Sequence, residues 1–362
     1  MVLSPLRPVL SPPAALAESL GGTGRADAVW SVLREGGDPF AEGAPLSART
    51  ATLLHERLAP PVGELALTVS SRCGTTKLLL RLADGHAIEA VLIPQDRHPQ
   101  GAPAAKARAF STLCVSSQVG CGRACAFCAT GTMGLLRSLS ADEILLQVHA
   151  AVRVARECGL PPVRNVVFMG MGEPGDNLGG VSEALSALVN PRGFGLFKRH
   201  VCVSTVGTSP STIRALKPLP ARLAWSVHAA NDVLRRRLVP TTRHTMTELR
   251  DAFGETLAAR GTTDHLMVEC TLIDGVNDTP EAADELAELL APLPGRTRVN
   301  LIPYNPNKGL GAYGRTFRPA HAKTVAAFQR RIMDSGTICT VRTTRGDADA
   351  AACGQLAARG AE

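Results

Sequence analysis

The strongest constraint on the fold is an alternation of two kinds of segment that begins near residue 110. Short apolar runs with the length of strands alternate with longer stretches whose apolar residues recur at helical spacing. This alternation predicts an α/β fold with a parallel sheet, either open or closed into a barrel. The expected strands are 112–115, 165–169, 201–204, 223–227, 266–272, 298–302 and 338–342, and the expected helices are 141–156, 181–188, 247–259, 280–290 and 319–335.

The first 110 residues predict a smaller unit of a different kind. Helical patterns occur at 26–35 and 48–58, and alternating segments at 65–69, 77–82 and 87–93 predict a small sheet. From these changes of pattern we expect a disordered tail at 1–20, an accessory domain at 21–100, a core domain at 101–356 and a C-terminal segment at 344–362.

Charge and hydropathy narrow the class of protein. The 362 residues carry a formal net charge of +7, which favours a polyanionic partner such as nucleic acid or, equally, a mildly basic enzyme. No apolar run approaches the length of a membrane span, so we expect no membrane partner. Prolines break the N-terminal segment, so we expect a cytoplasmic protein, with an organellar stroma or matrix as the alternative if this segment is a transit peptide.

Three of the ten cysteines stand in the spacing CxxxCxxC: Cys121, Cys125 and Cys128. Composition alone would produce this spacing in on the order of one chain in a hundred. Three thiolates on one loop can bind three irons of a [4Fe–4S] cluster and leave the fourth iron for S-adenosylmethionine (SAM). The alternative is a zinc site, which would need a fourth cysteine or histidine at a second short spacing.

Polar residues and glycines with chemical uses follow most of the expected strands. Because catalytic residues of α/β barrels gather at the carboxyl ends of the strands, we expect these residues to face one cavity. Each also has a structural alternative as a helix cap, a turn or a structural histidine. They are Gly172, Glu173, Ser204, Ser226, His228 and Asn305.

Two further cysteines and several basic clusters leave alternatives open. Cys353 lies near the C-terminus and could be inert or could be carried into the cavity, and Cys114 could be catalytic or a buried strand residue. The basic clusters 198–200, 235–237 and 243–244 could contact phosphates or form solvated helix faces.

Taken in order, the motifs resemble the RlmN/Cfr family of radical SAM adenine methyltransferases. The matching stretches are CVSSQVGC (114–121), the cysteine triplet, FMGMGEP (168–174), GFGLFKR (193–199), VSTVG (203–207), SVHAAND (226–232), GVND (275–278), VNLIPYNP (299–306) and TRGDADAAACGQL (344–356). The region before residue 110 resembles the family through GRADAVW (24–30) and IEAVLIP (88–94). The resemblance implies a partial (β/α)6-type barrel with a small N-terminal helical and β accessory domain, the latter of the RNA-binding kind.

The resemblance also implies a function and a set of site residues. The branch that it matches best methylates C2 of adenosine 2503 in 23S rRNA, and bacterial members also modify adenosine 37 of tRNA. The cysteine triplet would bind the cluster, Cys353 would carry the methyl group, Cys114 would resolve the intermediate and form a disulfide, and Glu89 would accept a proton. The implied SAM contacts are Gly172, Glu173, Ser204, Ser226, Val227, His228 and Asn305.

The implied chemistry consumes two SAM molecules per turnover. The first methylates Cys353, whose thiolate is a good nucleophile. The second gives a 5′-deoxyadenosyl radical, which takes a hydrogen atom from the S-methyl group, and the resulting carbon radical adds to the adenine ring. Loss of an electron and a proton then restores the aromatic ring. Cys114 then attacks the Cys353 sulfur and releases the product. Flavodoxin or ferredoxin would supply electrons.

Two departures from the family pattern concern Glu89 and Ala350. The stretch between residues 93 and 114 is longer than usual, and Ala350 stands where the family often has an acid. The alternatives are C8 methylation of the same adenosine, action on tRNA alone, and a non-catalytic zinc or RNA-binding protein.

Overall fold

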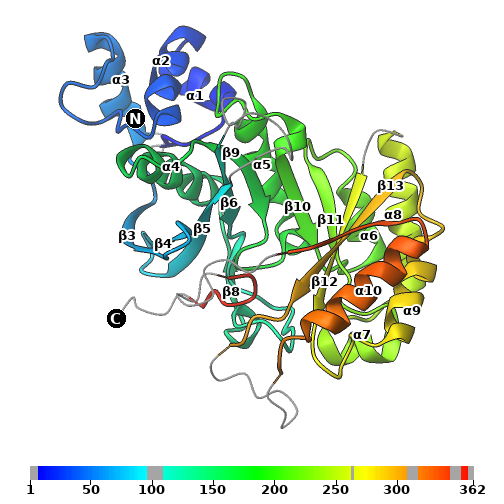
Figure 1. The fold of residues 1–362 in the computed structure, drawn as a ribbon. Helices are drawn as coiled ribbons and strands as arrows, with labels where there is room; N and C mark the ends of the chain where they lie inside the picture. Colours follow the sequence, from blue (N-terminus) through cyan, green and yellow to red (C-terminus); the bar gives the residue numbers. More distant parts are fainter. Residues whose placement is uncertain (1–6, 96–108, 262–264, 308–316, 343–351, 358–362) are drawn as a thin grey trace, which may run out of the picture.

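A parallel sheet forms the centre of the molecule, which we describe from a computed structural model covering residues 7–95, 109–261, 265–307, 317–342 and 352–357. The strand order β14-β13-β12-β11-β10-β9-β6 follows the chain without a reversal, as in a barrel that stays open (Figure 1). The α/β prediction is therefore confirmed. The parallel strands are β6 (Phe110–Val115), β9 (Val163–Phe168), β10 (Val201–Thr205), β11 (Arg222–Ser226), β12 (His265–Leu272), β13 (Arg296–Pro303) and β14 (Ile338–Val341).

Helices connect consecutive strands, as the alternation predicted. The connecting helices are α4 (Ala141–Glu157), α5 (Leu178–Val189), α6 (Pro210–Ala215), α7 (Asp232–Leu238), α8 (Met246–Arg260), α9 (Pro280–Leu290) and α10 (Ala322–Asp334). The short helices α6 and α7 were not expected, because a turn or two gives no clear periodicity. Helix α10 begins later than expected, since Pro319 forms a β-bridge with Ile273 and His321 is the N-cap.

The accessory strands extend the same sheet. Strands β3 (Gly63–Ser70), β4 (Thr76–Leu82) and β5 (Ala87–Gln95) are antiparallel, and β5 pairs with β6 across the proposed domain boundary. The boundary at residue 100 stays a prediction, because one hydrophobic core runs through both sides. Most of the long stretch between residues 93 and 114 falls on residues 96–108, which lie outside the described residues.

The N-terminal helices correct one expectation. Helix α1 (Pro13–Leu20) occupies part of the expected disordered tail and buries Leu16 and Leu20 completely. It packs on α2 (Thr23–Arg34) and α3 (Ala48–Arg57), and the short strands β1 (Arg7–Pro8) and β2 (Leu58–Ala59) pair nearby. The leucines repeat at helical spacing, a signal that the proline content of this stretch had outweighed.

Aromatic contacts fix these helices to the core. Trp30 of α2 is fully buried and meets Phe194 edge-on, with ring centroids 5.2 Å apart. Arg34 donates hydrogen bonds to the carbonyls of Pro191 and Gly193 in the same loop. Within the described part of the chain, no helix has the length and hydropathy to cross a membrane.

Candidate active site

The carboxyl ends of the parallel strands open into one cavity of about 1220 Å³, part of which is open solvent. Residues on or just after each of the parallel strands line this cavity, as the strand-end pattern predicted. The predicted residues that line it are Cys114, Cys121, Cys125, Cys128, Gly172, Glu173, Ser204, Ser226, His228, Asn305 and Cys353. The other two lie away from the lining: Val227 is fully buried, and Glu89 lies on β5.

The three clustered cysteines lie between two short strands. Strands β7 (Gln118–Gly120) and β8 (Leu135–Ser138) form an antiparallel hairpin, and we call residues 121–134 between them the cluster loop. Gly120 has φ +76°, and a Cβ there would lie 2.0 Å from the carbonyl oxygen of Gly134. Only glycine allows the strands to approach so closely at the point where the loop begins.

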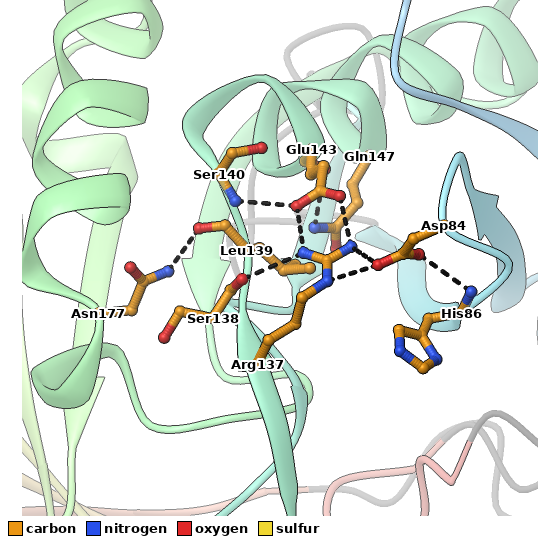
Figure 2. Close-up of polar contacts among 9 residues, drawn as sticks. All are labelled: Asp84, His86, Arg137, Ser138, Leu139, Ser140, Glu143, Gln147 and Asn177. Carbon is orange, nitrogen blue, oxygen red and sulfur yellow. Dashed lines mark hydrogen bonds and ion pairs between the residues drawn. The ribbon is translucent and has the colours of Figure 1, made fainter.

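A charged network anchors this hairpin, as Figure 2 shows. The Arg137 guanidinium on β8 donates to both carboxylate oxygens of Glu143, at 2.8 and 2.7 Å, and to Asp84 at 2.6 Å. Glu143 also accepts from the Ser140 backbone in the capping box of α4. The network therefore joins the hairpin to the start of α4 and to the β4–β5 turn.

The chemistry of the thiols suits a bound cluster. Burial raises the pKa of Cys121 to about 12 and raises that of Cys125 as well, so both thiols hold their protons unless a positive charge is supplied. A cluster supplies that charge and binds thiolates. The backbone N–H of Arg123 donates to the Cys121 sulfur, with 3.5 Å between nitrogen and sulfur, and can stabilise the Cys121 thiolate.

The arrangement gives no support to a zinc site. Across the described residues, no group of three His, Cys, Asp or Glu side chains is placed to hold a single metal ion. A cubane is different, because each thiolate binds a different iron and the sulfurs stay apart. The donor set and the cavity position therefore fit a [4Fe–4S] cluster at Cys121, Cys125 and Cys128.

Glu173 and Gly172 form a strand-end corner of the cavity. The Glu173 carboxylate is buried and accepts N–H groups of Gly175 at 2.8 Å and Val206 at 2.9 Å. Burial raises its pKa, and the two backbone donors oppose that rise. Each oxygen has a second lone pair, so the carboxylate can still receive the ammonium group of a ligand.

Packing inside the protein also requires glycine at position 172. A Cβ at Gly172 would lie 2.5 Å from the Cβ of Gln118. The space is filled by Gln118, whose side-chain oxygen accepts the Glu173 N–H at 2.9 Å. Gly172, with φ +97°, therefore places Glu173 by letting β7 pack against this corner.

The next strand ends contribute hydroxyl groups and an imidazole. The hydroxyl groups of Ser204 and Ser226 form a hydrogen bond, with 3.1 Å between the two oxygens. His228 accepts the Thr271 N–H at Nδ1, 3.1 Å away, so the neutral ring carries its proton on Nε2. Burial, with Arg235 nearby, lowers its pKa well below the usual value, which keeps the ring neutral. Its ring centroid lies 4.4 Å from that of Phe127 in the cluster loop.

One predicted basic cluster is not a surface feature throughout. Arg235 is fully buried, and its guanidinium donates to the carbonyls of Ser226, Val227 and Val206. It therefore ties together the ends of β10 and β11 and cannot contact phosphate. Its neighbours Arg236 and Arg237 are exposed. The sequence, a run of three arginines, could not show that one side chain is buried and the other two are exposed.

The C-terminal segment brings Cys353 to the cluster loop. We call residues 352–357 the Cys353 segment. Asn305 donates to the Cys353 carbonyl at 3.0 Å, the Ala129 N–H donates to Gly354 at 2.8 Å, and the Thr130 hydroxyl donates to Leu356 at 2.6 Å. Cys353 is exposed to the cavity, and residues 343–351, which precede it, lie outside the described residues.

Cys114 and Cys353 face the same space as free thiols. Burial and the neighbouring Cys353 raise the pKa of Cys114 to about 12, and Arg342 opposes this rise. Burial raises the pKa of Cys353, and Arg342 again lowers it. The pair is thus together in the cavity, although the two cysteines lie 239 positions apart in the sequence.

Arg342 and Glu269 are charged lining residues that the sequence analysis did not single out. Arg342 follows β14, and Glu269 lies on β12, where Asn300 donates to both its oxygens at 3.2 and 3.0 Å. Burial raises the pKa of Glu269, and Arg342 opposes the rise. A charged residue inside an otherwise apolar strand was the available signal, since such a residue must face a cavity or a partner.

Comparison with known proteins agrees with this geometry. The Radical SAM superfamily matches residues 115–290. A probable RNA methyltransferase of Sorangium cellulosum is 41% identical over 95% of this chain and 85% of its own length. A probable dual-specificity RNA methyltransferase RlmN of Frankia alni is 45% identical over 84% of this chain and 70% of its own. The crystal structure of a radical SAM methyltransferase from Sphaerobacter thermophilus is 35% identical, with a TM-score of 0.86 over 98% of this chain and 100% of that chain.

Proposed function

Because this chain belongs to the RlmN family of radical SAM RNA methyltransferases, we propose that it methylates C2 of adenosine 2503 in 23S rRNA. Adenosine 37 of tRNA is the second proposed substrate. The observation that carries the proposal is one cavity that holds a cluster triplet and two further free thiols, Cys114 and Cys353. A simple SAM-dependent transferase has no use for such a set.

We propose that Cys121, Cys125 and Cys128 hold a [4Fe–4S] cluster and that SAM binds beside it, two molecules per turnover. When bound, these groups supply a methyl group and the radical that activates it. Glu173, Ser204, Ser226, His228 and Asn305 line the cavity next to the cluster loop and offer acceptors and donors for the amino acid and ribose parts of SAM. Gly172 and Val227 contribute through the backbone, because they set the positions of the adjoining Glu173, Ser226 and His228.

Cys353 is the proposed methyl carrier. Its thiolate would accept the methyl group and bond through that carbon to the adenine ring, whose C2 is too electron-poor for ordinary methylation. Arg342 lines the same space and favours the thiolate.

Cys114 is the proposed resolving residue. Its thiolate would attack the Cys353 sulfur, a sulfur–sulfur bond would form, and the bond from sulfur to the methylene carbon would break. The released carbon takes a proton and becomes the product methyl group. Glu89 is the proposed proton acceptor for the ring hydrogen, and its contacts are considered below.

RNA binding and electron supply complete the proposal. Several basic residues are exposed and can contact phosphates, among them Lys198, Arg199, Arg236 and Arg237. A reducing partner such as flavodoxin or ferredoxin would supply electrons. We propose the cytoplasm as the compartment, where rRNA and tRNA are available.

The deciding experiment is nucleoside analysis of RNA from cells with and without this gene. We expect 2-methyladenosine at position 2503 to disappear with the gene. Appearance of 8-methyladenosine instead would identify the other branch of the family, and unchanged RNA would refute the proposal. Loss of methylation from tRNA alone would limit the substrate to tRNA.

A further inference from the structure

Glu89 makes contacts that a proton acceptor does not need. The carboxylate is 1% exposed, and its Oε1 lies 3.0 Å from Lys77 Nζ on the neighbouring strand. Its Oε2 accepts the backbone N–H of Ala357 at 3.0 Å. Burying a carboxylate is costly unless it is paired, and both oxygens are paired here.

The carboxylate is held in a fixed place. Glu89 lies in the middle of β5, directly opposite Leu79 of β4. Lys77 also belongs to β4, two residues before Leu79. The Ser116 hydroxyl donates to the Glu89 carbonyl at 2.6 Å, which fixes the backbone from the β6 side. Glu89 is therefore a fixed point, and its hydrogen bond to Ala357 determines where the Cys353 segment lies.

The Cys353 segment has no secondary structure of its own, and its position depends on bonds to other elements. Among the described residues, the other bonds to it come from the cavity rim: Ala129, Thr130, Asn305 and, through Gln355, the Pro306 carbonyl at 2.9 Å. All of these are neutral. The Glu89 bond is assisted by charge, and such bonds are roughly twice as strong as neutral ones.

We propose that the Lys77–Glu89 pair is a positioning device, which holds Cys353 in the cavity by binding the backbone of Ala357. Lys77 orients the carboxylate through their ion pair, and Glu89 accepts the Ala357 N–H. The role of Cys353 as methyl carrier rests on the proposed function, but the positioning contact does not. The accessory strands thereby contribute to the active site without lining it.

The test is hydrogen exchange in a double variant, Lys77→Met with Glu89→Leu. Replacing both partners leaves no unpaired buried charge, so the fold should be retained. We expect the amides of residues 352–357 to exchange about tenfold faster, because one charge-assisted bond is lost. The amides of β4 and β5 should exchange as in the wild type.

A matched control lies on the same strand. Arg81 of β4 is exposed and approaches Glu64 only at 4.0 Å, far from any bond to the Cys353 segment. Arg81→Met should leave exchange at 352–357 unchanged. Wild-type exchange in the double variant, or faster exchange throughout β4 and β5, would overturn the inference.

A second variant separates positioning from proton transfer. Glu89→Gln keeps an oxygen for the Ala357 N–H but cannot take a proton, and Lys77, 13% exposed, can turn its ammonium group to water. We expect exchange at 352–357 to rise by no more than about threefold, while Glu89→Leu raises it about tenfold. Equal exchange in the two variants would refute the bond to Ala357. Failure of the wild type to methylate RNA would refute the proposed function alone.

Discussion

The cluster loop and the Cys353 segment line the same cavity, but they are held in different ways. The cluster loop closes a hairpin that Arg137 ties to Glu143 and Asp84 by paired, charged contacts. The Cys353 segment has no strand or helix and is held by single hydrogen bonds, mostly from backbone and neutral groups. Glu89 supplies its one charged contact within the described residues.

The difference matches the tasks proposed for the two segments. A cluster needs three thiolates that stay in place, so a rigid anchor is an advantage. A cysteine that takes a methyl group, bonds to RNA and then meets Cys114 must change position. Single bonds of about 1 kcal/mol each can be exchanged one at a time, whereas a bidentate ion pair cannot.

The largest expected effect is loss of the cluster. Cys125→Ala removes one of three thiolates, so iron binding and formation of 5′-deoxyadenosine should both be abolished. Iron analysis and the visible absorption of anaerobically reconstituted protein measure this. Cys73→Ala, at an exposed position outside the cavity, is the control and should behave as the wild type. Normal SAM cleavage by Cys125→Ala would show that the ligands are misassigned.

A second prediction concerns the anchor of the hairpin. Arg137→Met leaves Glu143 buried without its partner, and we expect a loss of about 2 kcal/mol in the free energy of unfolding. Iron incorporation should also fall. Denaturant unfolding checks this against Arg153→Met, which breaks an exposed pair with Glu157 worth at most about 0.5 kcal/mol. If both variants unfold alike, the network is not the anchor.

A third prediction tests the charge next to Cys353. Arg342 lowers the pKa of the Cys353 thiol, so Arg342→Gln should raise that pKa and slow alkylation of Cys353 near pH 8. Below the pKa, the rate of alkylation falls in proportion to the thiolate fraction. Iodoacetamide labelling across pH, read by peptide mass spectrometry, measures this with Cys73 as the internal reference. Arg342→Lys should restore most of the rate, and an unshifted profile in Arg342→Gln would contradict the argument.

The smallest expected effect removes one neutral bond from the Cys353 segment. Thr130→Val keeps the shape of the side chain but loses the hydrogen bond to the Leu356 carbonyl, worth about 1 kcal/mol. Hydrogen exchange at 352–357 should accelerate about fivefold, and iron content should not change. A fall in iron content would mean that the two segments are not held independently.

Much of the fold and part of the site followed from local sequence. The alternation of short apolar runs with amphipathic stretches predicted the parallel sheet, because the periods of strands and helices differ. The triplet Cys121, Cys125 and Cys128 predicted a cluster because its ligands are close neighbours in sequence. Glu173, Ser204 and His228 were found because parallel strands end on one side of a sheet.

The tertiary structure decided what depends on distant contacts. Whether Cys114 and Cys353 meet depends on the curvature of the whole sheet. Cys114 lies on β6 in the middle of the sheet, whereas Cys353 lies in the segment that follows the last strand. Arg235 points inward and Arg236 outward because a helix turns about 100° per residue, and only packing fixes which side is buried. Glu89 was identified by resemblance alone, but its pairing with Lys77 and Ala357 needs three segments to converge. No local sequence pattern marks such a contact, because a buried charged group is stabilised by its partner and not by its neighbours in sequence.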